Sequence, residues 1–240
     1  MHWLDFREPV SAWTHCLWFL LSLPAGLVLW RLSRRDRIKQ VGFLVFSLSM
    51  AACYGASTLF HGLCLPRNRL EVFAKLDSIV IFLFIAGTMT PVALIVLRGH
   101  WQRGMLASAW LTAAGGIGLC LAFEHLPRAL STGLYLTMGW GVLLCYFALT
   151  RSLSHRAMRP AVLGGVCYSV GAVFNLLRWP VLYPGVFAAH EVFHLCVMAG
   201  TLAHFWFLVK VIAPFEHLPE SLLDEEGAGA GLTPAAAEAV

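Results

Sequence analysis

The sequence predicts an all-α integral membrane protein, a bundle of seven transmembrane helices. Of its 240 residues, 59% are hydrophobic and only 12% are charged, and the mean hydropathy is +0.73. Soluble domains are charged at about 25% of positions, so this composition excludes an ordinary soluble domain, and it equally excludes a disordered chain. The apolar stretches are about 20 residues long, as membrane-crossing helices are, whereas outer-membrane strands would alternate over about ten residues.

Seven apolar segments follow one another, each long enough as a helix to cross a hydrocarbon core of about 30 Å. They cover residues 12–32, 41–63, 73–97, 105–123, 131–149, 161–177 and 186–212. Short polar turns separate them, such as RLSRRDRIKQ after the first, LPRNRLE after the second and RSLSHRAMRP after the fifth. Because no loop is long enough to form another domain, we expect one seven-helix domain over residues 1–213.

The two flanks of this domain differ in composition. Residues 214–240 are acidic and then rich in small residues, which predicts a disordered tail. At the other flank, Asp5 and Glu8 stand where the basic region of a signal peptide belongs. We therefore expect the first apolar segment to be retained as a membrane anchor.

The distribution of positive charge predicts an orientation for this multi-pass protein. Eleven of the 17 Lys and Arg residues lie on the side of the first, third and fifth turns and of the C-terminus, and six lie on the other side. Because basic loops stay in the cytoplasm, we expect a cytoplasmic C-terminus and a place in the cell membrane, which is the inner membrane if the cell is bacterial. The formal net charge of +4 comes from these membrane flanks, so no nucleic-acid partner is expected.

Four ionisable side chains lie inside the apolar segments at one common depth. His61 ends the second segment, Asp77 lies near the start of the third, and His190 and His194 open the seventh. The second segment ends on the side of the membrane where the third and seventh begin, so all four lie about one helical turn inside the same face. Because a buried ionisable group is costly in a bilayer, such a group indicates function by default.

The spacing of the histidines favours a metal site. His190 and His194 are four residues apart and share a helix face, and His61 from a second helix would complete a set of three nitrogens. Three imidazoles plus a water form a catalytic type of zinc site, beside which Asp77 and Ser57 are placed as acid–base or supporting groups. The alternative for each histidine is a polar side chain that faces the lipid headgroups.

Three further polar residues have weaker interpretations. Glu191 gives the sequence HEVFH the H-E-x-x-H pattern of zinc proteases and is a candidate base, although it could equally face the headgroups. His204 lies ten residues beyond His194, about 15 Å along a helix, which is too far to bind the same ion. It is interpreted as an interhelical hydrogen-bond partner or a cavity-lining residue, and His15 as a packing residue or a support for the site.

Three motifs in this order resemble the hemolysin III family. They are S-T-L-F-H at the end of the second segment, L-D followed by A-G-T-M-T-P in the third, and H-E-V-F-H-L at the start of the seventh. The family is the bacterial branch of the progestin and adipoQ receptors, which include the adiponectin receptors and are distantly related to alkaline ceramidases. The resemblance covers essentially the whole seven-helix core.

The resemblance implies a zinc ion held by His61, His190 and His194, with Asp77 holding or activating the zinc-bound water and Ser57 nearby. It also implies hydrolysis of a lipid amide such as a ceramide, with membrane lipids, ceramide or fatty acid as partners. Adiponectin receptors place their N-terminus and zinc in the cytoplasm, whereas the charge distribution here predicts both outside.

Three functions remain open at this point. The first is a zinc-dependent membrane hydrolase of a lipid amide, and the second is a receptor or signalling protein with structural zinc. The sequence does not separate these two, because both need the same ligands. The third is a hemolysin-type cytolytic or channel protein, which ranks last because the fourth and fifth segments lack the continuous polar stripe that a pore needs.

Overall fold

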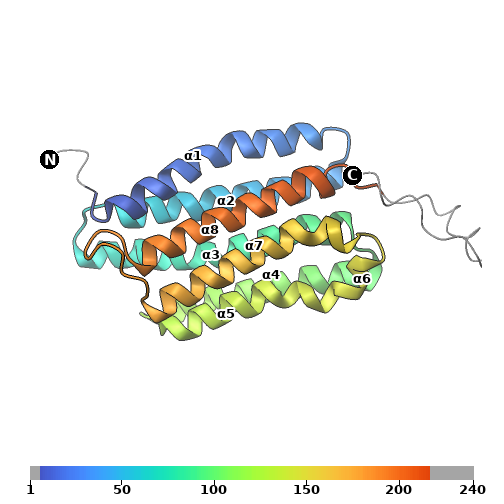
Figure 1. The fold of residues 1–240 in the computed structure, drawn as a ribbon. Coiled ribbons are helices and arrows are strands. Elements are labelled where there is room, and N and C mark those ends of the chain that lie inside the picture. The colour runs from blue at the N-terminus through green and yellow to red at the C-terminus, as the bar shows by residue number, and fades with distance from the viewer. Residues whose placement is uncertain (1–5, 217–240) are drawn as a thin grey trace, which may run out of the picture.

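The computed structural model describes residues 6–216 and confirms a bundle of seven membrane-length helices. Figure 1 shows these helices side by side along one axis. In chain order they are α1 (Pro9–Leu32), α2 (Arg37–Gly62), α3 (Arg67–Ile95), α4 (Gly99–Ala122), the fifth span Arg128–Thr150, α7 (His155–Leu177) and the seventh span Ala189–Ile212. Residues 217–240, which make up most of the predicted tail, lie outside the described residues.

Several helices begin earlier than the apolar segments do, because their first turns are polar. The Asp36 carboxylate caps α2 by accepting hydrogen bonds from the backbone N–H groups of Ile38 and Lys39, at 2.9 and 3.0 Å. The Ser154 hydroxyl accepts one from the N–H of Ala157 at the start of α7, at 3.1 Å. Such caps satisfy the free amide groups of a helix N-terminus. The polar and charged residues in these first turns lower the local hydropathy, so the apolar segments begin later than the helices do.

The fifth span departs from a single helix. It consists of α5 (Arg128–Trp140), a 3₁₀ segment η1 (Gly141–Cys145) and the short helix α6 (Tyr146–Thr150). Gly139 and Gly141 lie on either side of Trp140, where α5 ends, and each glycine weakens an α-helix by about 1 kcal/mol. The span still has the length and hydropathy to cross the membrane.

The seventh span begins three residues later than its predicted start at 186. Tyr183 and Phe187 pair through their backbones at 2.8 Å in both directions, which holds the preceding loop in a tight turn. Helix α8 (Ala189–Phe207) then continues as a π-helical segment, η2 (Leu208–Ile212).

The order of the helices brings one end of the bundle together. Helices α1 to α4 pack against their neighbours in sequence, α7 packs along α8, and α8 contacts α1. The start of α1 and the end of α8 lie at opposite ends of the bundle (Figure 1). As a result, the end of α2 lies at the same end of the bundle as the beginnings of α1, α3 and α8.

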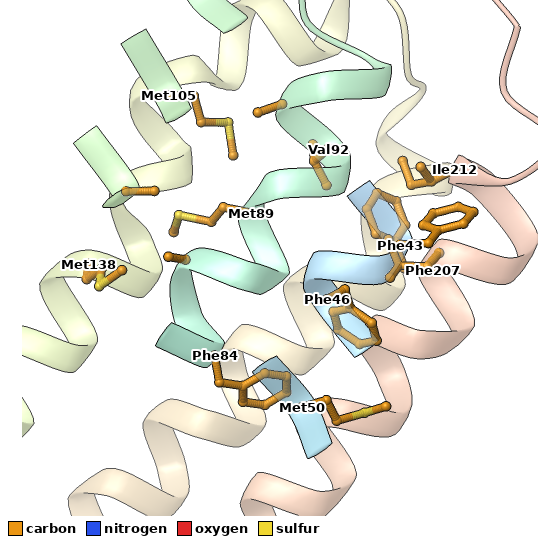
Figure 2. Close-up of a cluster of buried hydrophobic side chains, with 14 of the residues drawn as sticks. Phe43, Phe46, Met50, Phe84, Met89, Val92, Met105, Met138, Phe207 and Ile212 are labelled. Carbon is orange, nitrogen blue, oxygen red and sulfur yellow. The ribbon is translucent and has the colours of Figure 1, made fainter. Parts of the chain in front are cut away.

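The apolar core runs along the bundle between its helices, and Figure 2 shows part of it. Phe43 and Phe46 near the beginning of α2 pack in one buried cluster with Phe207 and Ile212 near the end of the last span. Phe84 of α3 belongs to the same cluster. Well-packed apolar side chains therefore hold the half of the bundle that is remote from the predicted histidine site.

Candidate metal centre

The structure brings the three predicted histidines together at one end of the bundle. One ring nitrogen from each of His61, His190 and His194 lies within 4.8 Å of the other two. The Nε2 atoms of His61 and His190 are 3.3 Å apart. The side chains of His61 and His194 are only 1% and 2% exposed. The group therefore joins α2 to α8 through buried imidazoles.

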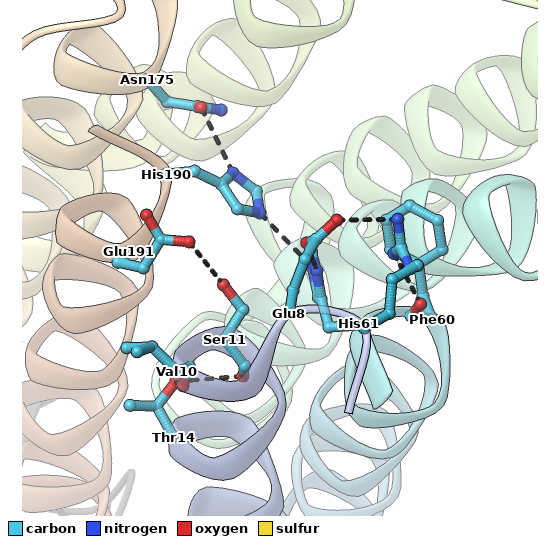
Figure 3. A network of polar contacts seen from close by, with 10 residues as sticks. Glu8, Val10, Ser11, Thr14, Phe60, His61, Asn175, His190 and Glu191 are labelled. Atoms are coloured by element: carbon cyan, nitrogen blue, oxygen red, sulfur yellow. Dashed lines mark hydrogen bonds and ion pairs between the residues drawn. The ribbon is translucent and has the colours of Figure 1, made fainter. Parts of the chain in front are cut away.

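Two of the rings are oriented by hydrogen bonds at their outer nitrogens (Figure 3). His61 Nδ1 bonds to the Glu8 carboxylate, and His190 Nδ1 bonds to Asn175 Oδ1 at 3.4 Å. Because a carboxylate and an amide oxygen only accept, each Nδ1 carries the hydrogen. Each Nε2 is thereby left with a free lone pair directed at the other ring, as a metal ligand requires.

Glu8 is itself held in position by the segment around it. Arg7 Nη1 lies 2.7 Å from Glu8 Oε1, and Arg7 Nη2 donates to the carbonyl oxygen of Phe60 at 2.7 Å. The backbone N–H of Glu8 donates to the carbonyl oxygen of His61 at 3.0 Å. The hydrogen bond from His61, helped by the nearby charge of Arg7, holds the pKa of the Glu8 carboxyl below its usual range. The carboxylate is therefore ionised where it meets the imidazole.

His194 completes the group from one turn further along α8. Its ring stacks on His15 of α1 with 3.7 Å between ring centroids. Its Nδ1 is buried and has no hydrogen-bond partner within residues 6–216. Both ring nitrogens of His15 are buried without a partner in the same part of the chain. His15 is thus a packing residue that fixes the His194 ring.

The donor set fits a zinc ion. Neutral imidazole is a standard zinc ligand at about 2.0–2.1 Å, which allows two nitrogens on one ion to lie at most about 4.2 Å apart. The observed spacing of up to 4.8 Å is slightly wider than this limit. An orphaned buried nitrogen on His194 is what a metal ligand presents. Three nitrogens leave a fourth position for water or substrate.

Asp77 and Ser57 lie beside this group. The Ser57 hydroxyl hydrogen-bonds to the Asp77 carboxyl, which also interacts electrostatically with His61. Both side chains line the same cavity as His190 and His194. The structure thus gathers the five residues that the sequence singled out at one end of α2, α3 and α8.

Glu191 has a different place from the one its motif suggested. Its Oε1 accepts a hydrogen bond from the Ser11 hydroxyl at 2.9 Å, and its Oε2 accepts one from the backbone N–H of Ala188 at 2.8 Å. One oxygen therefore caps α8 and the other ties α8 to α1. Through these two contacts Glu191 holds the start of α8.

An apolar cavity of about 660 Å³ extends from the metal centre through the bundle between α3, α5, α7 and α8. Its histidine end is lined by Ser57, Asp77, His190 and His194. We call the remainder the apolar body, whose wall includes Val92, Met105, Leu149, Met158, Val197 and Phe207. His204 also forms part of this wall, which agrees with its interpretation as a cavity-lining residue.

Glu8 and Asn175 are the site residues that sequence reasoning missed. Glu8 was noticed only as an argument against a signal peptide, and Asn175 lies near the end of the sixth segment. One signal was available for both: each is a polar residue that flanks or ends an apolar segment at the same membrane depth as the histidines. Their hydrogen-bond partners, however, lie in other segments of the chain, so the sequence does not indicate them.

Comparison with known proteins agrees with the resemblance carried by the motifs. The family model described as Haemolysin-III related matches residues 5–205. "Hemolysin-3" of Bacillus cereus is 34% identical over 210 residues, which cover 87% of this chain and 93% of that protein. The "Hemolysin-3 homolog" of Bacillus subtilis (strain 168) is 32% identical over 83% of this chain and 92% of its own length.

A more distant relative is the human "Monocyte to macrophage differentiation factor". It is 23% identical over 211 residues, with 86% of this chain and 85% of that protein covered. The family model spans α1 to α7 and most of α8, and so includes the segments from which the histidine group is built. This chain is therefore a member of the Haemolysin-III related family of multi-pass membrane proteins.

Proposed function

We propose that this protein is a zinc-dependent hydrolase that cleaves a lipid amide, such as a ceramide, within the membrane. The supporting observation is that His190 and His194, with Asp77 and Ser57, line one end of an apolar cavity. Its volume of about 660 Å³ lies within the range of about 300–1,000 Å³ that is usual for small-molecule sites. An apolar wall suits an acyl chain, and the histidine end suits the amide group.

The residues have complementary roles in this mechanism. A zinc ion held by His61, His190 and His194 would supply Lewis acidity, which acidifies water and polarises the amide carbonyl. Asp77 accepts a proton from the attacking water as the new C–O bond forms at the carbonyl carbon. It then delivers that proton to the leaving nitrogen as the C–N bond breaks, and the products are a fatty acid and an amine.

Other side chains hold this arrangement in place. The Ser57 hydroxyl bonds to Asp77 and so fixes the direction in which its carboxyl points. Glu8 and Asn175 keep hydrogens on the outer nitrogens of His61 and His190, which reserves the inner nitrogens for the metal.

The decisive experiment uses Asp77→Asn, with zinc content and fatty-acid release measured on the same detergent-solubilised sample. We expect Asp77→Asn to retain most of its zinc and to lose about 10²–10⁴-fold in ceramide cleavage, which is the usual contribution of a general base. Ser78→Ala is the matched control, because the only partner of its hydroxyl among residues 6–216 is the Ala74 carbonyl oxygen of its own helix. We expect full activity from that variant.

A receptor with structural zinc is the competing function, and the same samples decide between the two. If wild-type protein carries a full complement of zinc yet releases no fatty acid from any ceramide, acyl amide or phospholipid, the hydrolase proposal is wrong. In that case the metal serves to tie α2 to α8, which is the geometry that a structural ion also uses.

A cytolytic function is supported by the name of the relative from Bacillus cereus, "Hemolysin-3". The direct test is haemoglobin release from erythrocytes by purified wild-type protein and by Asp77→Asn. Equal lysis by both proteins would separate cytolysis from hydrolysis. Absence of lysis by either would remove the cytolytic function.

The orientation is a further part of the proposal. The excess of Lys and Arg at the end of the bundle opposite the histidines supports a cytoplasmic C-terminus and a metal centre near the outer face. Reporter fusions at the C-terminus and within residues 31–39 should both indicate the cytoplasm. A C-terminus reported outside would reverse the orientation and leave the fold intact.

A further inference from the structure

One histidine lies in the apolar body of the cavity, away from the metal centre. His204 of α8 is about 15 Å along the helix from His194, and its side chain forms part of the cavity wall. The cavity wall that it shares is largely apolar and includes Val197 and Phe207 from the same helix and Ala161 from α7. A polar group at this depth is costly unless it has a partner, so its presence needs an explanation.

Hydrogen bonding and stacking fix the ring of His204. Its Nδ1 lies 3.0 Å from the carbonyl oxygen of Gly200. Because a carbonyl only accepts, Nδ1 carries the hydrogen, and in the neutral ring Nε2 is then an acceptor. The ring also stacks on Tyr168, whose hydroxyl is 3.0 Å from the hydroxyl of Thr201. The His204 ring and the Tyr168 ring are therefore both held in place by contacts with α8.

The interface between α7 and α8 is shaped around this ring. A Cβ atom at Gly164 would lie only 2.2 Å from Nδ1 of His204 and 2.4 Å from its Cε1. A Cβ atom at Gly200 would lie 2.6 Å from the ring of Tyr168. Glycine at these two positions makes the space that the stacked pair occupies. The Nδ1–Cε1 edge of His204 lies against α7, and the side chain also forms part of the cavity wall. Within residues 6–216, Nε2 is not among the fully buried side-chain nitrogens that lack a partner, so it is accessible to a ligand.

We propose that His204 Nε2 is a hydrogen-bond acceptor that recognises an acyl chain with a hydroxyl group near its middle. The inference rests on the proposed function, in which the acyl chain lies in the cavity with its amide at the metal centre. Within residues 6–216, no group hydrogen-bonds to Nε2. A hydroxyl on the chain satisfies this acceptor, whereas a plain methylene chain leaves it unsatisfied.

Binding of fatty acids to the purified, zinc-loaded protein tests the inference. The probes are stearate and three monohydroxylated stearates, with the hydroxyl near the carboxyl group, at mid-chain or at the terminal carbon. Each competes with a fluorescent fatty acid for wild-type protein and for His204→Leu. Because hydroxylation also changes partitioning into detergent, the quantity compared is the affinity of each hydroxylated chain divided by that of stearate. Partitioning cancels when this ratio is compared between the two proteins.

We expect the ratio for the mid-chain isomer to be about threefold to tenfold higher in wild-type protein than in His204→Leu, the usual range for one hydrogen bond. The other two isomers should show no such difference. Phe207→Leu is the matched control, since it alters the same wall without removing a hydrogen-bonding group, and it should keep the wild-type ratio. Gly164→Ala should lower the ratio, because its Cβ displaces the His204 ring.

The outcomes separate this inference from the proposed function. If stearate binds but the mid-chain isomer has the same ratio in wild-type protein and in His204→Leu, the inference is wrong and the acyl-chain cavity stands. Should His204→Leu fail to fold, the comparison of the mid-chain and terminal isomers on wild-type protein decides, and equal affinity overturns the inference. Failure of wild-type protein to bind any of the four chains would overturn both.

Discussion

At the histidine end of the cavity, polar side chains hold one another, whereas in the apolar packing between helices, shape holds the helices together. His61 is bonded to Glu8, and Glu8 to Arg7, so the ring direction depends on a chain of charged hydrogen bonds. In the apolar packing of α4 against α3, outside the cavity wall, Gly116 leaves room for the ring of Phe82, whose nearest atom would lie 2.3 Å from an added Cβ. A polar end is sensitive to the loss of one atom, and apolar packing to a change of volume.

The comparison predicts that removing a ligand from the histidine end has the largest effect. His61→Ala should reduce bound zinc from about one ion per chain to near zero, because a three-histidine site loses a third of its donors. It should also lower the thermal midpoint of unfolding, since metal binding is coupled to folding. Elemental analysis of the purified protein measures the zinc.

His125→Ala is the matched control for that loss. His125 lies in the exposed loop between α4 and α5, at the same end of the bundle as the metal centre. It should retain full zinc. Equal zinc loss in the two variants would mean that the metal does not reside in the buried group.

A smaller effect is expected from the residue that orients a ligand. Glu8→Gln keeps the shape of the side chain but removes the carboxylate that bonds to His61 Nδ1. Zinc affinity should fall by about 10–100-fold, as for other carboxylates that support a ligating histidine. Titration against a competing chelator measures it.

Asn175→Ala provides the internal reference for Glu8→Gln. Its bond to His190 is neutral and long, at 3.4 Å, and neutral hydrogen bonds are weaker than charged ones. The affinity should fall less than in Glu8→Gln. A larger fall would show that the amide, and not the carboxylate, is the main support of the metal centre.

In the apolar packing between α3 and α4, a change of volume should alter stability without altering zinc content per folded molecule. Gly116→Ala places a methyl group against the ring of Phe82. Overpacking of this kind costs about 1–3 kcal/mol, which a thermal unfolding curve in detergent detects. Loss of zinc from the folded fraction of this variant would break the distinction between the two regions.

The smallest effect is expected where the apolar body changes shape but not volume. Met158→Leu replaces one cavity-wall side chain of α7 with another of similar size. Such exchanges cost less than about 1.5 kcal/mol, and zinc content should match that of the wild type. A larger loss of stability would indicate that the cavity wall is as finely matched as the core around Phe43 and Phe46.

The sequence alone was sufficient to predict the seven spans and the histidine group. Span length and hydropathy are properties of continuous segments, and the spacing of His190 and His194 is local to one helix. His61 could be added because an alternating path through the membrane places the end of the second segment at the level where the seventh begins. The residue types then indicated zinc, because imidazole is a standard zinc ligand and three such groups at one membrane depth would otherwise be costly.

Only the tertiary structure decided which segments that are distant in sequence contact one another. Glu8 meets His61 only because the start of α1 packs beside the end of α2, and Ser11 meets Glu191 because α1 contacts α8. Neither contact has a periodic signal in the chain. The direction of a side chain depends on how its helix is rotated against its neighbours, and that rotation is set by packing across the whole bundle. For the same reason, the sequence left two interpretations open for His204, and the structure placed it on the cavity wall.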